Sequence, residues 1–345
     1  MFANGTSRRY LHEATVVGDF TDVNTGNAFY TRFCNASQTD SRQAARLPAL
    51  KLRKPLGYPA PVKIHSEHLI GGYYLNDTGF TDVAVLSVLG FAPSKLSGGQ
   101  EFQKVLHDFI TTAKAAGKTK LIVDVQANGG GITSLGYETF LQLFPNIEPF
   151  GASVSRAHDG LNFLGQGISN RVQNTSITTP GNSEALERVG ASLSLNYAAD
   201  VSVNGTAFSS WSEVYGPHEA YGDSFTSLTR SNLSDPLFAL KEFPFINLTG
   251  RGNRVISPVP PFPAENVILL TDGFCSSTCA MLAEFLGTQA KVKSVTFGGR
   301  PDNKGPMQAV GGTKGTQVEA FGSIFRLIGV AAGLNSSGIR QIQEV

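Results

Sequence analysis

Residues 267–286 read VILLTDGFCSSTCAMLAEFL, and this stretch decides the fold. An apolar run typical of a buried strand passes through a turn of small residues directly into a predicted helix. The helix is indicated by side chains that repeat at helical spacing, namely Thr278, Met281, Leu282 and Phe285. Ser276 and Ser277 fall at the junction, where a helix N-terminus offers unpaired N–H groups and a positive dipole end.

The serines at this junction have two interpretations. A hydroxyl here can attack a carbonyl carbon while neighbouring backbone N–H groups bind the developing oxyanion. Serine is also a preferred N-cap residue, which needs no catalytic role. The junction alone therefore leaves a nucleophile and a plain helix cap both open.

Residues 121–132, LIVDVQANGGGI, form a second predicted strand that leads into a loop with Gly129, Gly130 and Gly131. Glycines let the backbone approach a ligand closely or adopt a positive φ. A phosphate-binding P-loop is excluded because its Gly-Lys-Ser/Thr ending is absent, and a dinucleotide loop because no G-x-G-x-x-G opens the helix. The loop is either a ligand-approaching backbone or only a tight turn.

Outward from these two segments, predicted strands and helices alternate along the chain. Residues 83–88 and 294–297 are further strand candidates, and apolar spacing predicts helices over 102–113 and 137–144. Such alternation is typical of an α/β fold with a largely parallel sheet.

The chain divides by composition into several parts. Apolar and polar side chains alternate over residues 14–20 and 27–33, as they do in strands. Residues 38–63 are polar, basic and proline-bearing, and residues 151–263 are rich in Ser, Asn and Gly and show no sustained hydrophobic period. The last of these predicts a lid or substrate-binding insert, with a disordered excursion as the alternative. The expected layout is a β-rich segment (1–37), a linker (38–63), a core (64–315) with an insert (151–263), and a C-terminal extension (316–345).

The two motifs together resemble the tail-specific (C-terminal-processing) serine peptidase family. The phrases YYLND, DVAVLSV, AKAAGKTKLIVDVQANGGG, QLFP, LLTDGFCSSTC and GPMQAVGG are similar to its fungal branch, which resembles the chlamydial protease-like activity factor. The resemblance implies a peptidase core of crotonase-like ββα units, with residues 1–37 as the tail of a PDZ-like domain. It implies Ser277 as the nucleophile, and an oxyanion hole from the N–H groups of Thr278 and of Gly129 or Gly130.

The chain departs from the family at the general base. Most members pair the serine with a lysine in a Thr-Phe-Gly-Lys-Gly phrase, and here the chain reads TFGGR at 296–300. Lys304 is a displaced candidate, and His158 and His218 of the insert are two others. The fungal branch uses a Ser/His/Glu arrangement whose other members find no match here. The chain is therefore expected to be a core fragment, weakly active or inactive by itself.

The resemblance implies a peptide or protein substrate, and the maturation of a ribosomally made precursor of a cyclic mycotoxin as one role. A non-catalytic peptide-binding pseudoprotease is the alternative, and a crotonase-like acyl-CoA enzyme is a third candidate. Such an enzyme also stabilises an oxyanion with backbone N–H groups, but it does not need Ser277.

Bulk properties exclude several other classes. With 28 basic and 27 acidic residues among 345, the chain lacks the clustered cations of nucleic-acid binding, and no apolar run approaches the length of a membrane helix. Cys275 and Cys279 are not in C-x2-C spacing and no histidine pair is near, so neither a metal nor another cofactor is expected. Their redox state stays open.

Eight Asn-x-Ser/Thr sequons predict a glycoprotein of the secretory pathway or the extracellular space, although residues 1–10 contain no signal peptide. The sequons start at Asn4, Asn35, Asn76, Asn174, Asn204, Asn232, Asn247 and Asn335. Chance occurrence in a chain rich in serine and threonine is the alternative.

Overall fold

The computed structural model describes residues 21–31, 58–173, 195, 197, 200–234, 246–251, 254, 257–298 and 328–329. The chain divides into two compact units, 1–53 and 54–345. Within the first unit the described residues contain one helix, α1 (Gly26–Phe29). The strand predicted over 27–33 is therefore wrong at its start, because the Thr25 hydroxyl accepts a hydrogen bond from the Ala28 N–H and caps a helix. Residues 14–20 and 32–33 lie outside the described part.

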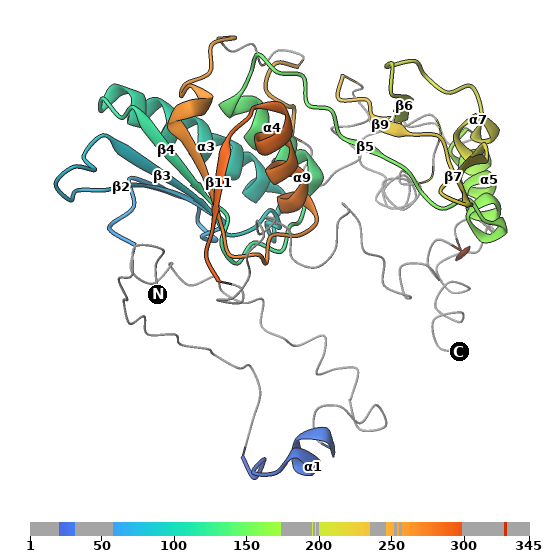
Figure 1. Cartoon of the computed structure of the whole chain (residues 1–345), viewed down its shortest axis with the longest axis horizontal. Helices are drawn as coiled ribbons and strands as arrows, with labels where there is room; N and C mark the ends of the chain where they lie inside the picture. Colours follow the sequence, from blue (N-terminus) through green and yellow to red (C-terminus); the bar gives the residue numbers. More distant parts are fainter. Residues whose placement is uncertain are drawn as a thin grey trace. The chain divides into compact units, whose positions relative to one another are not determined.

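A six-stranded sheet forms the centre of the second unit (Figure 1). Its spatial order is β1 (Lys63–Ile64), β2 (Ile70–Tyr74), β3 (Val83–Val88), β4 (Lys120–Asp124), β10 (Val267–Thr271) and β11 (Lys293–Thr296). The strands β3, β4, β10 and β11 are mutually parallel, whereas β1 and β2 join as an antiparallel edge. The prediction of an α/β fold with a parallel-rich sheet is confirmed. The crotonase-like description and the boundaries of the layout stay predictions.

One face of the sheet is covered at its central strands, and the other is covered only in part. Leu86, Val123 and Leu269 lie in register on the covered face and are at most 2% exposed. On the opposite face Ile268 is 40% exposed, so the strand predicted as buried over 267–270 is half-exposed at this position. Tyr58 packs edge-on against the Tyr73 ring, with a centroid separation of 4.7 Å.

Three helices of the core pack in sequence: α3 (Leu96–Ala115) against β2, α4 (Thr133–Leu143) against α3, and α9 (Thr278–Glu284) against α4 (Figure 1). A π-helical turn, η5 (Phe285–Gln289), continues α9. Aromatic rings fill the space between them, since Phe140 lies 5.3 Å from Phe285 between ring centroids and both are at most 1% exposed. This packing sets the direction in which α9 leaves the end of β10.

The insert has regular structure of its own. Its described part includes the helices α5 (Asp159–Gln173) and α7 (Trp211–Tyr215) and a small sheet with the order β5 (Ala152–Ser153), β9 (Thr229–Ser231), β6 (Asp200–Ser202). A hairpin of β7 (His218–Ala220) and β8 (Asp223–Phe225) follows α7, and the 3-10 turn η4 (Ala264–Asn266) precedes β10. The alternative of a wholly disordered excursion is therefore wrong for the described part of the insert.

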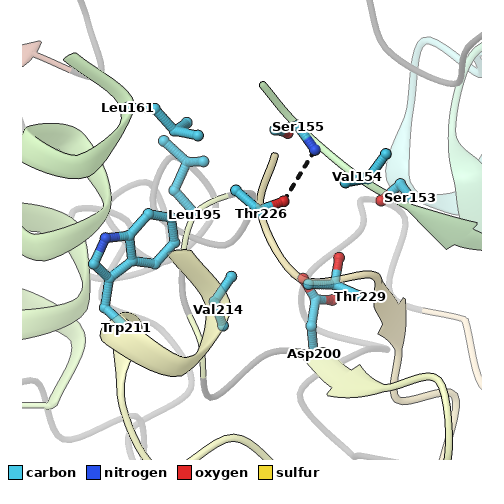
Figure 2. Close-up of a pocket in the computed structure, with 10 residues that line it drawn as sticks. All are labelled: Ser153, Val154, Ser155, Leu161, Leu195, Asp200, Trp211, Val214, Thr226 and Thr229. Carbon is cyan, nitrogen blue, oxygen red and sulfur yellow. Dashed lines mark hydrogen bonds between the residues drawn. The ribbon is translucent and has the colours of Figure 1, made fainter. Parts of the chain in front are cut away.

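A small cavity of about 90 Å³ lies inside the insert (Figure 2). Leu161, Trp211 and Val214 line its apolar side, and the Ser155 N–H donates to the Thr226 hydroxyl at 3.0 Å on its polar side. α5 and α7 can meet here because position 165 is glycine, where a Cβ atom would lie 1.9 Å from the Trp211 ring. The insert thus has a packed interior.

Among the described helices none combines the length and apolarity that crossing a membrane requires.

Candidate active site

Ser277 occupies the turn between β10 and α9, as the sequence predicts. Its backbone has φ +53° and ψ −126°, a conformation that non-glycine residues rarely adopt and that costs about 1–3 kcal/mol. Although it stands at the N-cap position, its hydroxyl makes no capping hydrogen bond with α9. The plain helix cap that the sequence left open is therefore not what this serine forms.

The glycine loop lies directly against this turn. A Cβ atom on Gly130 would stand 2.6 Å from the Cβ of Ser277 and 2.7 Å from the Ser276 carbonyl oxygen, so only glycine fits. Hydrogen bonds join the two loops, among them Ser276 N–H to the Asn128 carbonyl (3.4 Å), Ser276 hydroxyl to the Gly129 carbonyl (3.1 Å), and Thr278 hydroxyl to the Gly131 carbonyl (2.6 Å). The two segments that the sequence singled out meet at the carboxyl ends of adjacent strands.

Asn128 holds the glycine loop in place, a role that sequence reasoning missed. Its side chain is fully buried and donates to the Val88 carbonyl at the end of β3 (2.9 Å). Its amide oxygen accepts from the Gly130 N–H (2.8 Å). An asparagine in the loop that follows a buried strand was the available signal, since a polar side chain that becomes buried there needs partners.

The N–H groups of Gly129 and Gly130, the two candidate oxyanion donors of this loop, differ in their hydrogen bonding. The Gly130 N–H is already paired with Asn128, whereas the Gly129 N–H has no acceptor within the described residues. The same holds for the Thr278 N–H, one of the first N–H groups of α9, within the described part of the chain. The Gly129 and Thr278 N–H groups are therefore available as donors, and the assignment of the oxyanion hole stays a prediction.

A disulfide encloses the serine turn. Cys275 and Cys279 are bonded (S–S 2.08 Å) with their Cα atoms 5.3 Å apart, and both residues are fully buried. The ring spans Ser276, Ser277 and Thr278, so it ties the entry of the turn to the first turn of α9. The redox state that the sequence left open is the bonded one.

Carboxylates brace the start of both loops. Asp272 accepts from the Ala127 N–H of the glycine loop (2.9 Å) and from the Phe274 N–H of the serine turn (2.9 Å). Asp124 is 4% exposed and accepts from the Tyr58 hydroxyl and from the Gln126 N–H (2.9 Å). Burial raises the pKa of Asp124, and the negative charge of Asp272 adds to the rise. Burial, followed by the charge of Asp124, also raises the pKa of Tyr58.

The structure describes two of the three predicted bases, and both lie in the insert. His158 accepts the Leu161 N–H at the start of α5 (3.3 Å), and His218 pairs with the Ser227 hydroxyl beside the β7–β8 hairpin (2.8 Å). Lys304 lies outside the described residues. The assignment of a base to Ser277 stays a prediction. Within the described residues no group of three or more histidine, cysteine or acidic side chains is placed to hold a metal ion.

Comparison with known proteins gives relatives in one family. The chain is 34% identical over 294 residues to the Peptidase S41 family protein phomP1' of Diaporthe leptostromiformis, a match that covers 84% of this chain and 42% of that protein. It is 31% identical over 357 residues to the Peptidase S41 family protein ustP of Aspergillus flavus, which covers 98% of this chain and 70% of that protein. No protein-family model matches the chain.

Solved structures with some similarity include mature CPAF, alone and complexed with lactacystin. The TM-score is 0.35 and the identity 14% in both cases, over 69% of this chain and 42–43% of CPAF.

Proposed function

The chain belongs to the peptidase S41 family, and on that premise we propose that it hydrolyses peptide bonds through an acyl-enzyme formed on Ser277. One observation carries the proposal: a serine in a strained turn, not used as a helix cap, packs against the glycine loop, and the N–H groups of Gly129 and Thr278 have no acceptor among the described residues. The chain spans 42% of the length of phomP1', so the activity of the whole protein is part of the proposal.

In the proposed mechanism the Ser277 Oγ adds to the carbonyl carbon of a peptide bond. The N–H groups of Gly129 and Thr278 stabilise the oxyanion, since such donors act best at about 3 Å from the oxygen on which charge develops. The C–N bond then breaks, the amine leaves with a proton, and the acyl group stays on Ser277 as an ester. Water adds to the ester and releases the second product. The proton from Ser277 passes to a general base, for which Lys304, His158 and His218 are the candidates.

The test is covalent labelling with a fluorophosphonate, read as the mass of the intact protein and of its peptides. We expect one label per chain on Ser277, no label on Ser277→Ala, and labelling of Ser276→Ala at a rate within about tenfold of the parent, since loss of a nucleophile costs orders of magnitude. Labelling of a different residue would contradict the assignment of Ser277. A chain that binds peptides but is not labelled would instead be a pseudoprotease.

The finer proposals concern the substrate and the fold. We propose that the substrate is a ribosomally made precursor peptide in fungal mycotoxin biosynthesis, supported by the motif resemblance and by relatives in two fungi. Cleavage of a candidate precursor, followed by mass spectrometry with Ser277→Ala as control, tests it. The parallel strands and the helices that follow them also support crotonase-like ββα units, which an experimental structure would test.

A further inference from the structure

Phe274 presents an aromatic ring to solvent three residues before Ser277. The side chain is 59% exposed, although β10, which precedes it, and β4, which pairs with β10, both have buried apolar residues. A Cβ atom on Gly129 would stand 3.5 Å from the ring, so the ring lies beside the loop whose Gly129 N–H has no acceptor in the part of the chain that the structure describes. The exposed ring and the proposed oxyanion donor are therefore immediate neighbours.

The backbone around Phe274 is fixed. Its N–H donates to Asp272, whose other carboxylate oxygen accepts from Ala127 in the glycine loop. The next residue, Cys275, is fully buried and disulfide-bonded to Cys279 in α9. The ring is thus presented from a turn anchored on both sides, which is what a binding wall requires.

The position of the Phe274 ring determines which part of a bound peptide can contact it. A carbonyl oxygen bound to the Gly129 N–H places the side chain of the same substrate residue within a few ångströms of that loop. A peptide with an aromatic side chain at that residue could stack on Phe274, whereas an alanine there would leave the ring exposed.

We propose that Phe274 forms the apolar wall of a subsite that selects an aromatic side chain on the substrate residue whose carbonyl is attacked. The proposal rests on the peptidase function of Ser277 proposed above. It adds a specificity-determining residue, and it names the substrate class as peptides with an aromatic residue on the acyl side of the cleaved bond.

The test uses product-like peptides, because their register is known. In the full chain with Ser277→Ala, we would measure by fluorescence anisotropy the affinities of two labelled tetrapeptides ending in a free-carboxylate Phe or Ala. The C-terminal carboxylate is the part expected at the oxyanion donors. We expect the Phe-ended peptide to bind about tenfold more tightly, the size of an aromatic pair contribution, and Phe274→Ala to remove this preference.

Phe80→Ala is the matched control. Phe80 is 54% exposed but precedes β3, so it lies at the opposite edge of the parallel strands from Ser277. This variant should keep the preference for the Phe-ended peptide. Equal affinities for the two peptides, no measurable binding of either, or a preference that survives Phe274→Ala would overturn the proposal.

The outcomes also separate the subsite from the peptidase function. Fluorophosphonate labelling of Ser277 without a preference for the Phe-ended peptide keeps the peptidase and rejects the subsite. A preference that depends on Phe274 in a chain that is not labelled keeps the subsite and rejects the peptidase.

Discussion

At the scale of single residues, Asn128 fixes the conformation of the glycine loop that packs against Ser277. Its amide oxygen accepts a hydrogen bond from the Gly130 N–H, and its amide nitrogen donates to the Val88 carbonyl at the end of β3. The glycine loop is therefore held to β3 by a buried polar side chain. A buried amide with both ends satisfied holds one geometry, because rotating it would leave polar groups unpaired. In this conformation the Gly129 N–H has no acceptor among the described residues.

Asp124 makes the stability of the core depend on pH. A carboxyl group whose pKa is raised in the folded chain binds a proton more readily there, so its contribution to stability is present below the ordinary value of 3.8 and is lost as pH rises through the folded-state pKa. We expect the melting temperature to fall less between about pH 4 and pH 8 in Asp124→Asn than in the parent chain.

Asp82→Asn is the control of opposite sign. Hydrogen bonds from Lys120 and Thr119 lower the pKa of Asp82, so its contribution is lost only as pH falls below the ordinary value of 3.8. Above about pH 4, the melting temperature of this variant should change with pH as steeply as that of the parent chain. An identical slope for Asp124→Asn and the parent in thermal melts would refute the role given to Asp124.

At the scale of elements, the packing of the glycine loop on the serine turn can be tested with one methyl group. Gly130 has φ +99°, and an added Cβ would meet backbone atoms of Ser276 and Thr278 at 2.7 and 3.0 Å. We expect Gly130→Ala to displace the serine turn and to slow fluorophosphonate labelling by about 100-fold or more, as oxyanion-donor losses do.

Gly287→Ala is the matched control for this substitution, because nothing lies within 4 Å of its added Cβ. It should label at the parent rate. Labelling of Gly130→Ala at that same rate would show that the two loops are not packed as described.

The hydrophobic periodicity of the sequence predicted the strands and helices that bury one apolar face in the core. The ranges of β3, β4, β10, α3, α4 and α9 agree with the sequence to within a few residues at most ends, since burial of one face determines them. α3 begins earlier, at Leu96. α5 was missed because Gly160, Gly165 and Gly167 interrupt its pattern, and Gly165 is explained only by the Trp211 ring of a distant segment.

The candidate site was predictable to a similar extent. The Ser277 turn and the glycine loop carry local motifs, and the parallel order of β4 and β10 brings their ends together. The exposure of Phe274 and the role of Asn128 depend on contacts between segments far apart in sequence. No periodicity encodes such contacts.

At the scale of the whole molecule, two features favour an oxidising compartment. The Cys275–Cys279 disulfide is typical of proteins from such compartments, and the chain has eight sequons. Of these sequons, Asn76, Asn204 and Asn247 are exposed in the described part of the chain, and Asn76 and Asn204 each lie in a loop or turn between strands. We propose that the protein is a glycoprotein of the secretory pathway.

Asn76 gives the sharpest test, because its sequon Asn76-Asp77-Thr78 lies in the exposed turn between β2 and β3. When the chain is expressed behind a secretory leader in a eukaryotic host, we expect a glycan on Asn76, seen as a mass loss on glycosidase treatment. Thr78→Ala should remove this glycan while keeping the asparagine, and Thr78→Ser should retain it, because the acceptor rule requires a hydroxyl at that position. The turn can hold a glycan without disturbing the core, since residues 76–80 are all exposed. A secreted chain whose mass is unaffected by the glycosidase would leave the sequons as chance occurrences and remove this argument for the compartment.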